Sequence, residues 1–125
     1  MKDEKFSIMN RIKSFKYAFA GLKVLIQEEH NARIHLLTTL LVIITGFLLD
    51  VSTVEWAALV LAIGLVISLE AINAAIENIA NFVSPEKHEM IKKIKDLSAG
   101  AVLVGATTAI VIGAIIFIPK IMDIL

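Results

Sequence analysis

Residues 97–119 read LSAGAVLVGATTAIVIGAIIFIP, twenty-three consecutive residues without a formal charge, bounded by Asp96 and Lys120. About 20 mainly apolar residues in helical form cross the hydrocarbon core of a bilayer. This stretch therefore predicts a membrane-spanning helix, which we assign to residues 95–120 with its charged ends included. Three glycines of this helix are interpreted as helix-packing positions: Gly100, Gly105 and Gly113.

Two further spans precede this one in the chain. Residues 34–49 carry no formal charge, and Arg33 beside them can snorkel to lengthen a span over residues 33–50. A third apolar stretch is uncharged from residue 56 to residue 69 and then continues through Glu70 and Glu77, which predicts a span over residues 55–81. The expected fold is an all-α integral membrane protein with three transmembrane helices.

Composition supports this class and excludes others. Of the 125 residues, 58% are hydrophobic and 19% are charged, against about 25% charged in a typical soluble domain. The 12 basic and 12 acidic side chains cancel, which argues against a nucleic-acid binder driven by basic charge. The absence of cysteine excludes a disulfide framework and a cysteine-based metal site. The length allows one domain, residues 1–125.

The N-terminal region, residues 1–32, has a different pattern. Its apolar residues recur at alternating spacings of four and three, which is typical of a helix lying in the membrane interface. The residues of this stripe are Ile8, Ile12, Phe15, Phe19, Leu22 and Ile26. The alternative is a surface helix packed on the protein's own bundle. A signal peptide is not expected, because the basic start and short apolar core with a cleavage site are missing.

The loops predict the orientation of the chain. Seven of the twelve Lys and Arg residues lie in residues 1–33 and four lie in residues 78–96, whereas residues 50–55 carry none. The positive-inside rule therefore assigns the N-terminus and the 82–94 region to the cytoplasm. Within that region we expect a short polar helix, with Ser84 as its cap and Pro85 in its first turn.

Polar side chains on the second span predict its chemistry. Glu70, Asn73 and Glu77 lie at positions i, i+3 and i+7, so they share one helical face, and ionisable groups inside a span are candidates for a functional site. Glu77 falls at the inner boundary, and Glu70 lies seven residues deeper, about 10 Å at 1.5 Å per residue. The deeper carboxylate suits a general base for a lipid headgroup. The alternative is a polar face that pairs subunits by interhelical hydrogen bonds.

Further polar groups fall at the level of Glu77. Carboxylates such as Glu29 and Glu77 suit Mg²⁺, which takes one or two carboxylates together with substrate phosphates. Lys95 can hold phosphate oxygens as a point charge. The chain has no GxxxxGK[ST] sequence, so a nucleotide site of P-loop type is excluded. The histidines have no metal-ligand spacing.

Two motifs resemble a known family. EAINAAIE at 70–77, followed by KDLSAGAVL at 95–103, resembles the prokaryotic diacylglycerol kinase family, a set of small three-span membrane kinases. The sequences EEHNARIH at 28–35, EW at 55–56 and IFIPK at 116–120 are similar to its Gram-positive branch, whose members act mainly as undecaprenol kinases. The resemblance covers nearly the whole chain.

The resemblance implies a role for each motif position. It implies that Glu70 is the proton acceptor and that Glu29 and Glu77 hold Mg²⁺ with ATP. It implies lipid-substrate contacts at Glu70, Asn73 and Ala99. The implied nucleotide contacts are Arg11, Tyr17, Glu29, Glu77, Glu86, Lys87, His88, Lys95 and Asp96. It further implies a homotrimer with shared active sites in the bacterial cell membrane.

Two positions depart from the family pattern: Ala74 stands where Ser or Thr is usual, and Asn81 where Asp is usual. The expected function is an ATP-dependent lipid kinase that makes undecaprenyl phosphate from undecaprenol, with diacylglycerol as the alternative acceptor. A small proton or cation transporter subunit with Glu70 as its intramembrane site is the alternative from another class. A purely structural oligomerisation module is a third.

Overall fold

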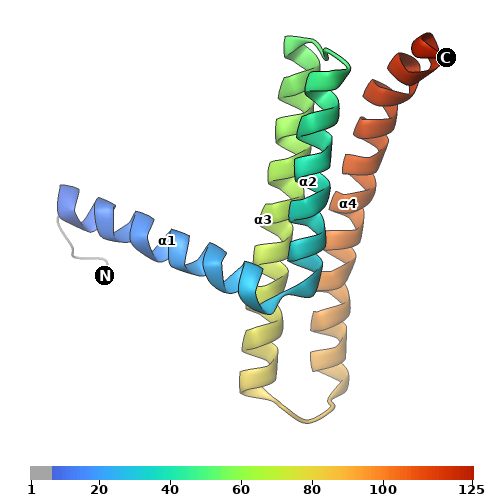
Figure 1. The fold of residues 1–125 in the computed structure, drawn as a ribbon. Coiled ribbons are helices and arrows are strands. Elements are labelled where there is room, and N and C mark those ends of the chain that lie inside the picture. The colour runs from blue at the N-terminus through green and yellow to red at the C-terminus, as the bar shows by residue number, and fades with distance from the viewer. Residues whose placement is uncertain (1–6) are drawn as a thin grey trace.

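The structure, a computed structural model, describes residues 7–125, so the first six residues of the predicted 1–32 region lie outside it. The described chain is helical, with three connections between helices (Figure 1). The helices are α1 (Ile8–Glu28), α2 (His30–Leu48), α3 (Thr53–Val83) and α4 (Glu89–Ile124). Three of them, α2, α3 and α4, are long and apolar enough to cross a membrane, which confirms the predicted three-span class.

The α3–α4 connection corrects one prediction. Ser84 ends α3, with its backbone N–H donating to the carbonyl of Ala80, and no helix begins at Pro85. Instead His88 is the N-cap of α4, where its Nδ1 accepts a hydrogen bond of 3.0 Å from the backbone N–H of Met90. The expected short polar helix is therefore the first part of α4, and α4 also continues through Pro119 beyond the predicted end at residue 120.

Local chemistry fixes the other helix boundaries. Ser52 and Glu55 form a reciprocal capping box that starts α3. Between α1 and α2 the backbone breaks at Glu29, which caps both helices in an extended conformation. Arg33 donates through Nε to the carbonyl of Ile26 at 2.7 Å, and it donates through Nη2 to the carbonyl of Gln27. Arg33 thus satisfies carbonyls in the last turn of α1 instead of snorkelling along the span.

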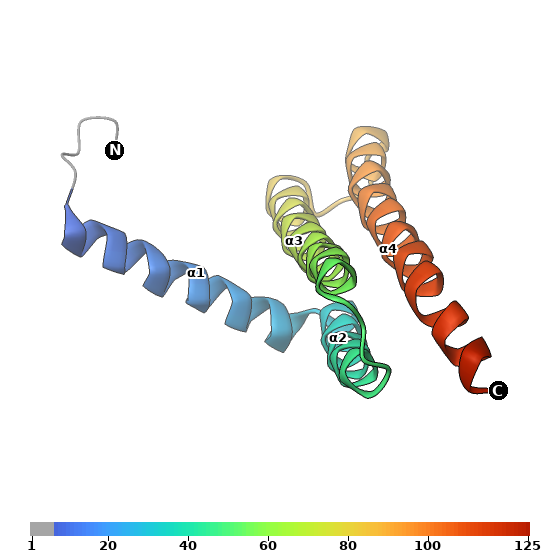
Figure 2. The same ribbon diagram turned by 90° about the horizontal axis from the view of Figure 1, so that it is seen from above.

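The three long helices form one bundle. α3 and α4 run antiparallel as a hairpin, and α2 packs against α3 (Figures 1 and 2). Near the α2–α3 turn, Val51, Leu59 and Ile116 are buried together. Gly46 is needed there, because a Cβ at this position would lie 2.5 Å from the indole of Trp56. On α4, a Cβ at Gly105 would clash with Leu69, which confirms that glycine as a packing position; Gly100 has open space instead, and at Gly113 a Cβ would only just touch Phe117 of the same helix.

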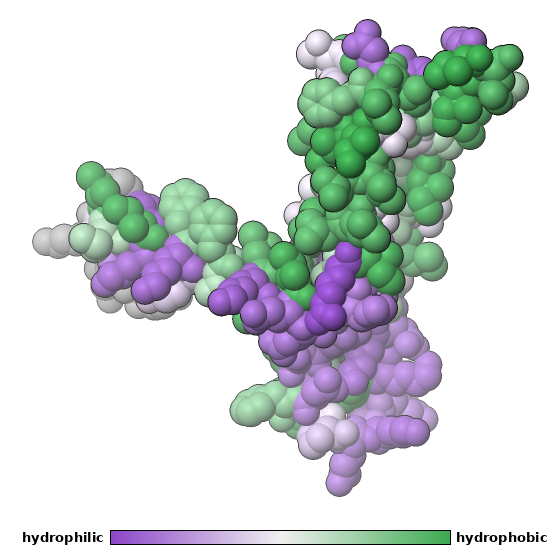
Figure 3. Space-filling view, viewed as in Figure 1, coloured by the Kyte–Doolittle hydropathy of each residue, from purple (hydrophilic) through white to green (hydrophobic). Residues whose placement is uncertain are grey.

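The hairpin is longer than a membrane is thick. α3 has 31 residues and α4 has 36, which correspond to about 46 Å and 54 Å of helix, against a hydrocarbon core of about 30 Å. Figure 3 shows an apolar shaft above and a polar surface around the lower end of the hairpin. The polar end carries the loop at 84–88, so the bundle has room for a site outside the apolar layer.

α1 projects sideways from the bundle at the junction of its apolar and polar parts (Figures 1 and 3). Leu25, near its C-terminal end, is its one buried residue. The predicted apolar stripe of α1 is exposed along its length: Ile8, Ile12, Phe15, Phe19, Leu22 and Ile26. The alternative of a helix packed along the bundle is therefore not what the structure has. Its location in the membrane interface stays a prediction.

Candidate functional site

Glu70 of α3 is almost completely buried, with 3% of its surface exposed. Its Oε1 lies 3.0 Å from Nε2 of His35 on α2. This contact has the distance of an ion pair but not the direction of a hydrogen bond, and Oε1 has no hydrogen-bond partner among the described residues. A buried carboxylate without full hydrogen bonding is costly, which makes Glu70 a functional candidate on energetic grounds.

Small side chains bring His35 and Glu70 together. Ala32 of α2 and Ala74 of α3 are buried against each other and against Leu25, at the elbow where α1 meets α2. His35 follows Ala32 by three residues, and Glu70 precedes Ala74 by four, so each lies about one helical turn further into the apolar shaft. The close approach at the two alanines therefore fixes the distance between the imidazole and the carboxylate.

An apolar cleft begins at His35 and extends toward the α2–α3 turn. It lies between α2, α3 and α4 and has a volume of about 320 Å³. Its lining is formed by Ile34, His35, Thr38, Thr39, Val42, Leu59, Ala62, Ile63, Val66, Ala106, Ala109, Ile110, Gly113 and Phe117. The cleft can take a hydrocarbon chain whose polar end lies near the Glu70 carboxylate.

Two hydrogen bonds connect α3 to α4 on the polar side of Glu70. The hydroxyl of Ser98, itself buried, donates to Oδ1 of Asn73 at 2.6 Å. The ammonium of Lys95 donates to Oδ1 of Asn81, also at 2.6 Å. Asn73 and Asn81 of α3 thus meet the start of α4, whereas Glu70 lies against His35 of α2. Ser98 was not singled out from the sequence, although it stands inside the KDLSAGAVL motif.

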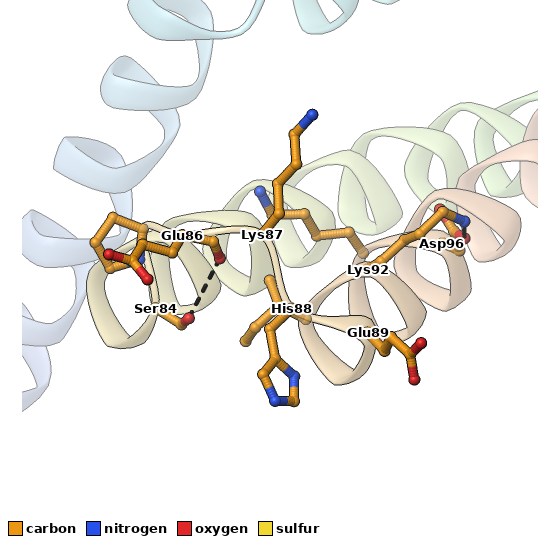
Figure 4. Close-up of a pocket in the computed structure, with 10 residues that line it drawn as sticks. Ser84, Glu86, Lys87, His88, Glu89, Lys92 and Asp96 are labelled. Carbon is orange, nitrogen blue, oxygen red and sulfur yellow. Dashed lines mark hydrogen bonds and ion pairs between the residues drawn. The ribbon is translucent and has the colours of Figure 1, made fainter.

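A cavity of about 520 Å³ opens at the 84–88 loop, and we call it the loop cavity (Figure 4). Five predicted nucleotide contacts line it together: Glu86, Lys87, His88, Lys95 and Asp96. The lining also includes Lys92, whose ammonium lies 2.6 Å from Oδ2 of Asp96. The lining carries three lysines beside three carboxylates, Glu86, Glu89 and Asp96, so the cavity offers cationic contacts for a polyphosphate next to acidic groups.

Glu29 lines a second cavity, of about 370 Å³, between the elbow and α3, which we call the elbow cavity. Asn78 lines its opposite side, so Glu29 lies at the level where α3 carries Glu77. Both carboxylates are partly exposed, and within residues 7–125 neither makes a hydrogen bond or an ion pair. One or two carboxylates with free oxygens are what proteins commonly use to hold Mg²⁺ together with substrate phosphates, and the two here fit that pattern. The described residues contain no cluster of three or more acidic or histidine ligands.

Comparison with known proteins identifies the family. The model for prokaryotic diacylglycerol kinase matches residues 16–117. The chain belongs to this family. It is 37% identical to undecaprenol kinase of Bacillus subtilis, over 95% of this chain and 97% of that protein. It is 35% identical to diacylglycerol kinase of Synechocystis, over 93% of this chain and 67% of that protein, and 29% identical to diacylglycerol kinase of Escherichia coli, over 80% of this chain and 82% of that protein.

Both departures from the family pattern have a structural counterpart. Ala74 is buried in the contact between the elbow and α3, where a smaller side chain permits close packing. Asn81 accepts the hydrogen bond from Lys95 through a neutral amide oxygen.

Three predicted residues lie apart from these cavities. Arg11 and Tyr17 are exposed on α1 and line neither the loop cavity nor the elbow cavity. Ala99 is exposed on α4, beside the buried Ser98. The described chain does not bring these three residues to Glu70, so any role for them at the site requires a neighbouring subunit or a bound ligand.

Proposed function

We propose that this member of the family is an ATP-dependent lipid kinase whose acceptor is undecaprenol and whose product is undecaprenyl phosphate. The observation that carries the proposal is the position of Glu70, a buried carboxylate between an apolar cleft and a polar hairpin end. A lipid alcohol combines an apolar chain, which fits the cleft, with a reacting hydroxyl, which would face the polar end of the hairpin.

In this proposal Glu70 is the general base. It takes the proton as the O–H bond of the acceptor breaks, while a bond forms between the acceptor oxygen and the γ-phosphorus of ATP. The bond from that phosphorus to the bridging oxygen of ADP breaks in the same reaction. Asn73 and Ala99 are assigned to the lipid headgroup. The hydrogen bond from Ser98 restrains the Asn73 amide, which supports its use as a fixed polar contact.

The nucleotide is assigned to the polar end of the hairpin. Lys95 neutralises charge on the transferred phosphoryl group, since only one of its three N–H donors is used by Asn81. The remaining proposed nucleotide contacts are Arg11, Tyr17, Glu86, Lys87, His88 and Asp96. The loop cavity supports the last four of these as one group, because all four line it.

Mg²⁺ is the proposed metal, with Glu29 and Glu77 as its protein ligands. Bound with ATP, it supplies charge neutralisation at the phosphate oxygens. The two unpaired carboxylates at one level of the bundle support this assignment, because each has oxygens available for a cation. The elbow cavity brings Glu29 to the part of α3 that carries Asn78, next to Glu77 in sequence.

Assembly and location complete the proposal. We assign the protein to the bacterial plasma membrane, with its N-terminus and the 84–88 loop in the cytoplasm and α1 in the interface. The exposed apolar stripe of α1 supports an interfacial location. A homotrimer with shared sites is proposed as well. The open space at Gly100 and the distance of Arg11 and Tyr17 from the cavities support a contribution from neighbouring subunits.

A parallel assay of two acceptors tests the proposal. Purified protein in mixed micelles is given labelled ATP with undecaprenol or with diacylglycerol, and the lipid phosphate is counted. Faster phosphorylation of undecaprenol is expected. Diacylglycerol is the second candidate because relatives of 35% and 29% identity are diacylglycerol kinases. Phosphorylation of neither lipid, combined with ion flux in proteoliposomes, would establish the transporter alternative instead.

A further inference from the structure

His35 is a polar residue of the site to which no role has been assigned. It stands within an apolar stretch of α2, and its imidazole is held 3.0 Å from the buried carboxylate of Glu70. We infer that His35 is a positioning residue for Glu70: its imidazole holds the carboxylate in the orientation that receives the acceptor proton. The inference rests on the proposed kinase function.

The first argument concerns the environment of Glu70. Glu70 and Ser98 are the two buried polar residues of residues 7–125, and Ser98 has its partner in Asn73. For the carboxylate of Glu70, the imidazole of His35 is the one side chain within ion-pair distance in the described chain. A buried carboxylate loses its hydration, and a polar side chain at this distance is placed to offset that loss. His35 is therefore positioned to orient the carboxylate as well as to fill space.

The second argument concerns the direction from which the acceptor arrives. His35 lines the apolar cleft, whereas Glu70 does not. A lipid hydroxyl at the polar end of the cleft therefore meets the imidazole beside the carboxylate. The present contact lacks hydrogen-bond direction, and catalytic hydrogen bonds are often poorly aligned until the substrate is bound. We expect the Nε2–H to align with Oε1 when the hydroxyl occupies the other oxygen.

Three variants separate positioning from packing. His35→Leu fills a similar volume in the apolar cleft without a donor, and we expect kcat to fall by about 10- to 100-fold while KM for ATP stays within about twofold. His35→Gln keeps an N–H donor of comparable reach and should recover most of this loss. His30→Ala changes an exposed histidine of the same helix and should leave kcat unchanged.

A double variant tests whether His35 acts through Glu70 or lowers the rate by an unrelated structural effect. If His35 acts through Glu70, His35→Leu has no further effect on the residual rate of Glu70→Gln, because the group it orients is gone. Each variant is first checked by its elution and thermal unfolding in detergent.

Several outcomes overturn the inference. Wild-type kcat in His35→Leu does so, as does a loss in His35→Gln equal to that in His35→Leu. A raised KM for the lipid at unchanged kcat would mean that His35 only lines the cleft. Equal effects of His35→Leu in the wild-type and Glu70→Gln backgrounds would mean that it acts independently of Glu70. If the wild-type protein phosphorylates neither lipid, the proposed function fails, and this result is distinct from all of the above.

Discussion

Replacing Glu70 by glutamine tests the central assignment of the site. The amide has nearly the size of the carboxylate, so the packing around a side chain that is 3% exposed is kept. The amide cannot accept a proton from the acceptor alcohol. A positioned general base contributes about 10²- to 10⁴-fold to a rate, which is about 2.7 to 5.4 kcal/mol at 1.36 kcal/mol per factor of ten.

The burial of Glu70 sets the expected loss at the upper half of this range. Water cannot easily take over the proton at a side chain that is buried beside His35 of α2. ATP affinity should be unchanged, because Glu70 does not line the loop cavity or the elbow cavity. Glu70→Gln is thus expected to lower kcat by about 1,000-fold or more with an unaltered dissociation constant for ATP.

The assay measures initial rates of lipid phosphorylation at saturating substrate, with ATP binding measured separately by equilibrium titration. Glu55→Gln is the matched control, because it is the same substitution on the same helix but lies beside Lys120 at the opposite end of α3. It should retain wild-type activity. A Glu70→Gln protein with a rate within about tenfold of wild type would refute the base assignment, since a positioned base is worth more than that.

Three further substitutions test the metal site, the packing and the α3–α4 contact. Glu77→Gln should raise the Mg²⁺ concentration for half-maximal rate by about tenfold or more, with little change in thermal unfolding; an unchanged Mg²⁺ dependence would contradict its role as a ligand. Gly46→Ala should destabilise the protein by about 1 to 2 kcal/mol, because the new Cβ must displace the Trp56 indole, whereas Gly64→Ala, with open space, should not; equal melting temperatures in detergent would contradict this. Ser98→Ala leaves the Asn73 amide oxygen without its donor and should cost about 1 to 3 kcal/mol, again measured by thermal unfolding; no change would mean that the bond is not stabilising.

The membrane-spanning helices could be predicted because hydropathy alone determines them. The start of α4 could not, because the Ser84–Pro85 pattern is compatible with a cap and with a helix end. The hydroxyl of Ser84 donates to the carbonyl of Glu86 at 3.3 Å, and among the described residues no backbone N–H donates to it, so it does not act as a helix cap. A histidine ring nitrogen then caps α4 four residues later, and histidine is not among the usual capping residues.

Helical spacing predicts only part of the candidate site. Glu70, Asn73 and Glu77 share one face of a single helix, so their spacing is sufficient to group them. The contact between Glu70 and His35 joins residues 35 positions apart in sequence, and it depends on how closely α2 packs against α3. That distance is set by Ala32 and Ala74, two alanines whose sequence context has no visible connection to chemistry.

The excess length of the hairpin gives a short chain both an apolar cleft and a separate polar cavity. α3 and α4 exceed the hydrocarbon thickness by about 16 Å and 24 Å, and this excess carries the loop cavity. Because α3 continues without a break from Glu70 to Glu77, the buried carboxylate and the boundary carboxylate are held about 10 Å apart along one rigid rod. Their relative direction is fixed by seven residues of helix, close to two full turns, which keeps them on one face. A separate nucleotide-binding domain would have to be docked against the membrane to achieve this alignment, whereas a continuous helix provides it directly.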